Sequence, residues 1–310
     1  MVKCNICNHN VKYKFVLTRS KKKLRINVCN NCDYDFFEFD NKNNLKKDKL
    51  DRHRLNTAGL KKPTQKEDFI NGLKQSEEYI KKHLTNKKIN ILEIGSSWGY
   101  FLLCAKKKGH KCTGVEINEI RRKYINKNLK INCFANIEEL KNSKFDKIFL
   151  FYSLEYISKP LNYLKKLKNY LRKGGEIIIY TPNKNDHLNC LADLKEYDKF
   201  FYEENSINYF SQKSLKNLCK KITNKYSVIL LQGYSIINLI NWLLHKKPFS
   251  TGYVGKDNFV KEIISKLKAK TKSQENIVKK IKNKFIKFDF FFKKNLILNN
   301  ISNIILLKIK

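Results

Sequence analysis

The stretch ILEIGSSWGYF, residues 91–101, decides the fold of this 310-residue chain. An apolar segment ends in an acidic residue, a turn with two glycines four positions apart follows, and an apolar helical pattern begins after the second glycine. In a parallel sheet, ligands bind beyond the carboxyl ends of the strands, where glycine lets the backbone approach them closely. The stretch therefore predicts a buried strand, a ligand-binding turn and a helix.

Strand and helix patterns alternate over the middle of the chain. Short apolar runs rich in branched residues predict strands, and longer stretches with apolar residues on a helical repeat predict helices. The predicted strands are 89–94, 112–117, 130–134, 145–152, 176–180 and 227–231, and the predicted helices are 65–84, 101–105, 119–128, 137–140, 161–171 and 214–221. Repeated β-α units of this length predict an α/β fold with a mostly parallel sheet covered by helices on both faces.

A carboxylate ends the second predicted strand. Glu116 follows the glycine turn by about 20 residues, the spacing at which an acidic side chain in such folds hydrogen-bonds ribose hydroxyls. A dinucleotide site needs G-x-G-x-x-G, because its second glycine admits the pyrophosphate. Here Gly95, Ser97 and Tyr100 stand at those positions, so the glycine that would face the phosphates is missing. The pattern favours a nucleoside without phosphates, S-adenosylmethionine, over NAD.

Several further motifs follow the glycine turn in order. They are FDKI at 145–148, FYSLEYI at 151–157, LRKGGE at 171–176 and YTPN at 180–183. The stretch 90–183 resembles the class I S-adenosylmethionine-dependent methyltransferases. The resemblance implies their Rossmann-like sheet, which is mostly parallel with an antiparallel last strand, and it identifies residues 301–309 as that last strand.

The resemblance also implies which residues bind the cofactor. They are Glu93, Gly95 and Gly99 at the methionine end with Ser96 beside them, Glu116 at the ribose, Ile117 and Asn136 at the adenine, and Tyr152 at the transferring methyl group. Two other interpretations stay open. Carboxylates at strand ends can be ordinary surface groups, and an asparagine after a strand can be an ordinary turn residue.

The catalytic residues are less well defined, because the family's H-x-L-E-H loop has tyrosines in place of both histidines. Tyr152 and Tyr156 stand at those positions, and a tyrosine pKa lies about three units too high for a general base at neutral pH. His187, after the fifth predicted strand, and Glu155 are the remaining candidates for the base, and Tyr152, which would face the transferring methyl group, is the third candidate catalytic residue. Many methyl transfers need little beyond alignment of the reacting atoms, so the use of a base stays open.

Four cysteines form a separate pattern at the N-terminus. Cys4 and Cys7 make one C-x2-C pair, Cys29 and Cys32 make a second, and 21 residues separate the pairs. Two predicted strands, 13–17 and 24–28, lie between them around a lysine-rich turn. This is the layout of a zinc ribbon, in which two cysteine knuckles hold a structural Zn²⁺. An iron–sulfur site or a redox thiol pair is the alternative.

These patterns divide the chain into five ranges. They are a zinc ribbon (1–40), a linker with a helix (41–88), a methyltransferase core (89–235), a basic helical insertion (236–300) and a final core strand (301–310). Polar residues interrupt the longest apolar run, 227–244, so we expect no membrane span. The chain also lacks a signal-peptide pattern, and we expect a cytoplasmic protein. Its C-terminal helices would form a cap or a homodimer surface, and attachment of a basic amphipathic helix to a membrane surface is the alternative.

The net charge of +37 admits two interpretations. A strongly basic chain favours a nucleic-acid partner. Lysine greatly outnumbers arginine, however, and Asn, Ile, Tyr and Phe are abundant, as an AU-rich coding sequence produces. We therefore attribute most of the charge to composition.

Three functions compete on this basis. The ribbon, with the YFS element at 209–211, resembles a branch of the family whose members often modify sugars or other small metabolites, which favours a small-molecule or glycan acceptor. The alternatives are an RNA methyltransferase, whose ribbon and insertion would contact phosphates, and a non-catalytic protein that binds the cofactor.

Overall fold

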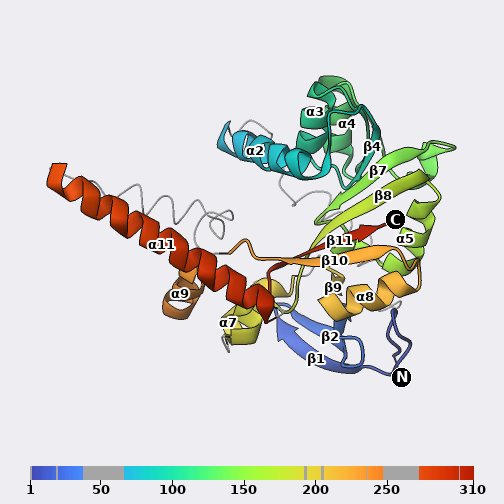
Figure 1. Ribbon diagram of the computed structural model, residues 1–310. Helices are drawn as coiled ribbons and strands as arrows, with labels where there is room; N and C mark the ends of the chain where they lie inside the picture. Colours follow the sequence, from blue (N-terminus) through green and yellow to red (C-terminus); the bar gives the residue numbers. More distant parts are fainter. Residues whose placement is uncertain are drawn as a thin grey trace.

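The computed structural model describes residues 2–18, 20–37, 66–191, 194–203, 206–234, 236–246, 272–299 and 301–310. These residues form a seven-stranded sheet with helices on both faces, a smaller four-stranded sheet at the N-terminus, and two C-terminal helices (Figure 1). The parts of the predicted linker and helical insertion at 38–65 and 247–271 lie outside the described residues.

The large sheet has the strand order β10-β11-β8-β7-β4-β5-β6. Its strands are β4 (Asn90–Ile94), β5 (Lys111–Val115), β6 (Asn132–Phe134), β7 (Phe145–Phe151), β8 (Leu171–Pro182), β10 (Tyr226–Leu231) and β11 (Ile304–Ile309). β4, β5, β6, β7 and β8 are parallel, and β11 lies antiparallel between β8 and β10. The predicted Rossmann-like sheet with an antiparallel last strand is confirmed.

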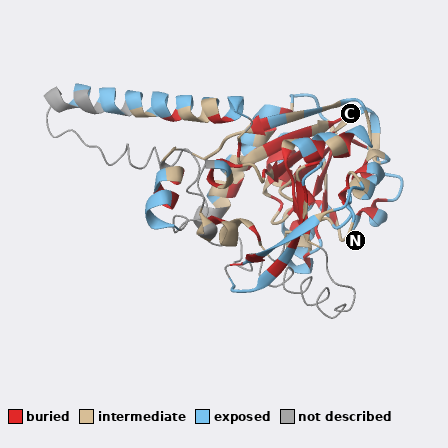
Figure 2. Ribbon diagram, turned by 90° about the horizontal axis from the view of Figure 1, so that it is seen from below, coloured by how far each residue is buried: buried red, intermediate tan, exposed pale blue. Residues whose placement is uncertain are grey.

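The central strands consist of continuous apolar runs because both faces of the sheet are covered by apolar side chains. On one face, α2 (Lys66–His83), α3 (Tyr100–Lys107) and α4 (Glu119–Asn128) pack over the sheet around Phe149. On the other face, η2 (Ile137–Leu140), α5 (Pro160–Lys168) and α8 (Gln212–Lys220) pack over Ile148 and Leu150. Figure 2 shows this buried interior at the centre of the molecule.

The fifth strand is longer than the sequence predicted. Its glycine pair was expected to lie in the turn before residue 176, but β8 begins at Leu171. Pairing with β7 shifts from Phe145↔Leu171 to Lys147↔Glu176 across this segment. Gly174, at a φ of 79°, has the left-handed backbone that the bulge requires.

The N-terminal sheet joins the ribbon to the core. β1 (Lys12–Leu17), β2 (Lys23–Cys29) and β3 (Tyr34–Phe37) are antiparallel, and the fourth strand is the core's own β9 (Asn208–Tyr209). The sequence predicted only the first two strands and treated the ribbon as a separate unit. Pairing of β3 with β9 makes the sheet continuous across the two ranges.

Side-chain contacts reinforce this junction. Lys184, which follows β8, lies 3.0 Å from a carboxylate oxygen of Asp33 and 2.7 Å from one of Asp35. Tyr202 donates to the other oxygen of Asp35 at 2.8 Å. Asp35 is almost wholly buried, so these contacts are shielded from solvent and fix the ribbon against the core.

The remaining helices follow β8 and β10. α6 (His187–Leu191) and α7 (Lys195–Phe201) lie after β8, and η3 (Leu154–Tyr156) lies after β7. α9 (Ile236–His245) and α11 (Lys272–Leu298) lie within the predicted helical insertion, and α11 extends away from both sheets (Figure 1). Within the described ranges, no helix combines the length and hydropathy that crossing a bilayer requires.

Candidate active site

The turn after β4 has an unusual backbone. Gly95, Ser97 and Gly99 have φ values of 75°, 50° and 75°, in the left-handed region that favours glycine. The amides of Gly95 and Ser96 both donate to the carbonyl oxygen of Val115, at 2.8 and 3.1 Å. The turn is thereby fixed at the carboxyl end of β5.

The turn also approaches the loop after β7 closely. A Cβ atom at Gly95 would lie 2.3 Å from Oγ of Ser153, which itself donates to the carbonyl of Ile94 at 3.0 Å. At Gly99, a Cβ atom would lie 2.8 Å from Cδ1 of Leu129. Both glycines are therefore required by backbone conformation and by space.

Two buried carboxylates flank the turn. Glu93 is the penultimate residue of β4 and pairs in register with Gly114, and Glu116 follows the neighbouring β5. Glu116 accepts hydrogen bonds from the amides of Ser97 at 2.7 Å and Asn118 at 2.8 Å. In contrast, Oε2 of Glu93 is buried without a hydrogen-bond partner among the described residues.

Burial controls the electrostatics of this pair. It raises the pKa of Glu93 well above the usual value, and the nearby charge of Glu116 raises it further. Burial also raises the pKa of Glu116, although its two backbone hydrogen bonds oppose the change. A buried carboxylate oxygen without a partner is costly, so this site is suited to a ligand that brings hydrogen-bond donors or positive charge.

The remaining predicted cofactor residues differ in how accessible they are. Ser96 is buried and donates to the carbonyl of Glu93 at 3.0 Å, whereas Ile117 is 66% exposed beside Glu116. Asn136 caps η2: its side chain accepts from the amide of Glu139 at 3.2 Å and donates to the Glu139 carboxylate at 2.8 Å. Its amide is thus engaged within its own turn, as the alternative interpretation expected.

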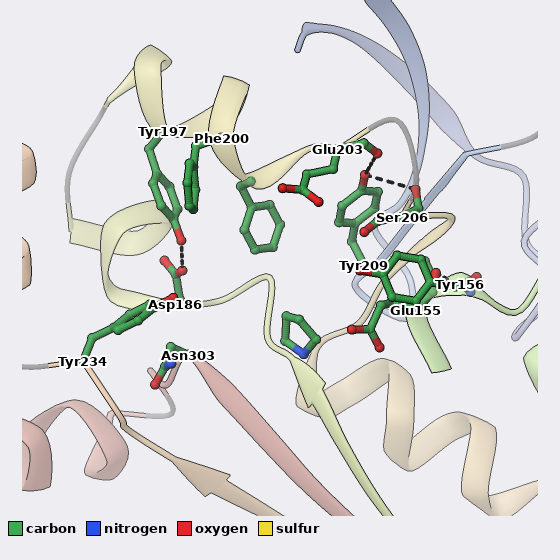
Figure 3. Close-up of a pocket in the computed structure, with 13 residues that line it drawn as sticks. Glu155, Tyr156, Asp186, Tyr197, Phe200, Glu203, Ser206, Tyr209, Tyr234 and Asn303 are labelled. Atoms are coloured by element: carbon green, nitrogen blue, oxygen red, sulfur yellow. Dashed lines mark hydrogen bonds between the residues drawn. The ribbon is translucent and has the colours of Figure 1, made fainter. Parts of the chain in front are cut away.

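A partly open pocket of about 190 Å³ lies beyond the carboxyl ends of β7 and β8 (Figure 3). Figure 3 shows Asp186 and Tyr197 on one side of it and Glu155, Tyr156 and Tyr209 on the other. The full lining is Glu155, Tyr156, Pro182, Asp186, Tyr197, Phe200, Phe201, Glu203, Ser206, Asn208, Tyr209, Tyr234 and Asn303. Of the three predicted catalytic residues, only Glu155 lines it.

The carboxyl groups of this pocket have raised pKa values. Burial raises the pKa of Glu155 to about 8, and its nearest hydroxyl partner is Thr181, which donates to Oε2 at 3.3 Å. Burial raises the pKa of Asp186 to about 6. Asp186 accepts from the amides of Leu188 and Asn189, both at 2.9 Å, and from the hydroxyl of Tyr197.

His187 and Tyr152 do not line the pocket. His187 is fully buried, with Nδ1 3.2 Å from Nε2 of Gln232, and burial lowers its pKa to about 4. Its Nε2 has no hydrogen-bond partner in the part of the chain that the structure describes. Tyr152 has a φ of 50°, and burial raises its pKa well above the usual value. Neither side chain is suited to accept a proton from a substrate in the pocket.

Sequence reasoning missed most of the pocket. Asp186 is adjacent to the predicted His187, and the aspartate rather than the histidine faces the cavity. The segment 196–203, which is rich in acidic and aromatic residues, supplies Tyr197, Phe200 and Glu203. That composition was the available signal, but it has no fixed spacing that would identify a ligand.

The four ribbon cysteines come together as predicted. Their Sγ atoms all lie within 4.8 Å of one another, with Cys4 3.5 Å from Cys32 and Cys7 3.4 Å from Cys29. These distances are too long for disulfide bonds. A tetrahedral Zn²⁺ with Zn–S bonds of about 2.3 Å separates its sulfurs by about 3.8 Å, so the four thiols fit a metal ion.

The comparisons with known proteins give the class. Residues 32–222, more than half of the chain, match the family described as methyltransferase domain, and the chain belongs to this family. Together with the strand order and the glycine turn, this makes it a class I S-adenosylmethionine-dependent methyltransferase. No curated protein matches the chain.

Several solved structures are similar to this chain. A SAM-dependent methyltransferase from Archaeoglobus fulgidus is 17% identical with a TM-score of 0.47, over 77% of this chain and 92% of that one. Coclaurine N-methyltransferase, bound to N-methylheliamine and SAH, is 16% identical with a TM-score of 0.44, over 77% and 70%. The plantazolicin methyltransferase BpumL, in complex with SAH, is 16% identical with a TM-score of 0.41, over 86% and 90%.

Proposed function

We propose that this methyltransferase acts on a small-molecule acceptor whose reacting group enters the pocket between Glu155 and Asp186. The observation that carries the proposal is the pocket itself, which lies at the same end of the sheet as the glycine turn and has the buried Glu155 and Asp186 in its wall. The pocket has a volume of about 190 Å³. Sites for drug-sized ligands typically have volumes of about 300–1,000 Å³. The pocket is therefore large enough for one end of an acceptor, such as a sugar ring or another small metabolite.

The residues around the glycine turn fit S-adenosylmethionine, which supplies an electrophilic methyl group on a sulfonium. Gly95 and Gly99 leave space for its methionine end, and the unpartnered Oε2 of Glu93 suits that end's hydrogen-bond donors. Glu116 supplies carboxylate oxygens for the ribose, and the exposed Ile117 offers an apolar surface to the adenine. Asn136 is bonded within η2, so we assign it no adenine contact.

Within the pocket, Glu155 is the proton acceptor that we favour. It lines the cavity, and its pKa of about 8 lies close to neutral pH, where proton transfer to a general base is efficient. Asp186 holds the wall through its bonds to α6 and to Tyr197. The loop from Tyr152 to Glu155 connects this group to the glycine turn through Ser153.

The test of the proposed function is binding of S-adenosylhomocysteine. Because a ligand of the native state raises apparent stability, we expect saturating S-adenosylhomocysteine to raise the melting temperature by several degrees. NAD at the same concentration should leave it unchanged. A shift with NAD alone, or with neither compound, would contradict the assignment.

Alanine substitution at Gly95 tests whether the turn forms the binding site. We expect Gly95→Ala to weaken S-adenosylhomocysteine binding at least tenfold in calorimetry, because the new Cβ collides with Ser153 and forces the turn to move. Gly174→Ala is the matched control. It has the same backbone strain, with a φ of 79°, but nothing lies within 4 Å of its Cβ position, so affinity should stay unchanged. If Gly95→Ala and Gly174→Ala bind S-adenosylhomocysteine with equal affinity, the turn does not form the binding site.

We further propose that the four ribbon cysteines hold a structural Zn²⁺. Cys4, Cys29 and Cys32 are buried and Cys7 is half-buried, which suits a closed site with four protein ligands. Metal binding supplies folding free energy in small units of this kind.

RNA is the second candidate acceptor, and one surface favours it. On the open face of the ribbon, Tyr13 and Phe15 are 56% and 55% exposed. Arg25 lies over the Tyr13 ring and Lys23 over the Phe15 ring. Exposed rings among cations resemble the stacking surfaces that bind single-stranded nucleic acid. RNA binding would weaken steeply with added salt, whereas binding of an uncharged acceptor would not.

The predicted homodimer also remains a proposal. α11 leaves Phe288, Phe290 and Phe291 more than half exposed, at 56%, 69% and 62%. Exposed aromatic side chains on one helix are typical of association surfaces. We propose that α11 packs against a second copy of the chain.

A further inference from the structure

The charge of the pocket is opposite to that of the chain. The chain has 65 basic and 28 acidic residues, yet the described residues that line the pocket include three carboxyl groups and neither lysine nor arginine. The carboxyl groups belong to Glu155, Asp186 and Glu203. The composition of the lining therefore differs from that of the chain as a whole.

The partners of two of these carboxyl groups are neutral. Asp186 accepts from two backbone amides and one tyrosine hydroxyl, and Glu155 accepts from the hydroxyl of Thr181. The lysine nearest to them in the sequence, Lys184, is bound to Asp33 and Asp35 of the ribbon. This lysine therefore does not pair with the carboxyl groups of the pocket.

Aromatic rings form most of the remaining wall. They belong to Tyr156, Tyr197, Phe200, Phe201, Tyr209 and Tyr234. The faces of such rings attract cations, and walls of several rings bind substituted ammonium groups. An anionic acceptor, such as a sugar phosphate or a nucleotide, would instead meet like charges in a pocket of low polarity.

We propose that the acceptor is an amine that is cationic at neutral pH, and that its nitrogen receives the methyl group. The inference rests on the proposed function and narrows its acceptor class. It combines the three carboxyl groups, the six rings and the absence of a basic side chain among the described lining residues.

The reaction balances with Glu155 as proton acceptor. An ammonium group has no lone pair, so the bound amine first gives one N–H proton to the Glu155 carboxylate. The nitrogen lone pair then forms the new N–C bond while the methyl donor's C–S bond breaks and its electron pair stays on sulfur. The product is again an ammonium ion, the donor leaves as a neutral thioether, and Glu155 returns its proton to solvent.

Binding of choline tests the inference, because a quaternary ammonium cannot be methylated and does not titrate. Choline is compared by calorimetry with its uncharged isostere, 3,3-dimethylbutanol, in protein saturated with S-adenosylhomocysteine. We expect choline to bind at least tenfold more tightly, a difference of about 1.4 kcal/mol. The advantage should increase from pH 6.5 to 8.5, because the pKa of Glu155 is about 8 and only its ionised form attracts the cation.

Substitutions of the lining residues test whether the pocket causes the preference for choline over 3,3-dimethylbutanol. Glu155→Gln should reduce the choline advantage at least fivefold and weaken its pH dependence between pH 6.5 and 8.5, and Asp186→Asn should also reduce the advantage. Glu138→Gln is the control, since Glu138 is exposed and pairs with Lys166 on the surface. Glu138→Gln changes the net charge by the same amount and should leave the preference for choline over 3,3-dimethylbutanol unchanged.

The possible results separate the two claims. Equal affinity for choline and its isostere, no detectable choline binding, or tighter binding of glucose 6-phosphate than of choline would each overturn the amine inference while S-adenosylhomocysteine still binds. Failure of the protein to bind S-adenosylhomocysteine would instead contradict the proposed function.

Discussion

Glu116→Ala is expected to weaken S-adenosylhomocysteine binding by at least 100-fold. The substitution removes the carboxylate that we assign to the ribose, and hydrogen bonds to a charged group contribute about 1.5–3 kcal/mol each. It also leaves the amides of Ser97 and Asn118 without the acceptor that orders the turn. A 100-fold loss corresponds to about 2.7 kcal/mol, so loss of the ribose contacts alone accounts for it. Isothermal titration calorimetry measures the change.

Glu119→Gln is the matched control for this experiment. Glu119 is three residues away, on the exposed side of α4, and pairs with Lys123 at 2.7 Å. Its neutralisation should leave affinity within twofold, because exposed ion pairs contribute little. If Glu116→Ala keeps a wild-type circular dichroism spectrum and binds within threefold of wild type, the ribose assignment is wrong.

The second large effect is expected from Cys32→Ser. We expect this variant to lose one equivalent of zinc and to melt about 10 °C lower, because a structural metal supplies several kcal/mol to such a unit. Choline affinity in the pocket should fall more than 20-fold. The reason is that β3 begins two residues after Cys32 and pairs with β9, whose Asn208 and Tyr209 line the pocket.

Three measurements check this prediction: metal analysis by mass spectrometry, thermal melting, and calorimetry with both ligands. S-adenosylhomocysteine affinity should stay within threefold, since the glycine turn contacts other elements. Cys190→Ser, at an exposed cysteine outside the cluster, is the control and should change none of these values. Retention of full choline binding by a zinc-free Cys32→Ser protein would show that the ribbon does not support the pocket.

Much of the core could be predicted from local sequence patterns. Alternating strand and helix signals predicted the parallel sheet, because each β-α unit is encoded by neighbouring residues. The turn at Gly95 and Gly99 was also predictable, since glycine spacing reports backbone conformation directly. The structure brings Glu93 and Glu116 together at this turn as expected.

The acceptor pocket could not be predicted in the same way. Its residues come from separate segments, among them 155–156, 197–209 and 303, which meet only through the tertiary fold. The two-residue strand β9 is too short to leave a periodic signal, so its pairing with β3 was missed. His187 was chosen for its chemistry, but its neighbour Asp186 points into the cavity because α6 begins there and buries the imidazole.

The sheet shared by β3 and β9 limits how this protein can be divided or recombined. Deleting residues 1–37 would strip β9 of its backbone partner and leave the half-buried ammonium of Lys184 without either aspartate. Exchange of the N-terminal unit between relatives would therefore succeed only when β9, Lys184 and the residues that contact them are exchanged with it, so we expect these segments to be inherited as one piece.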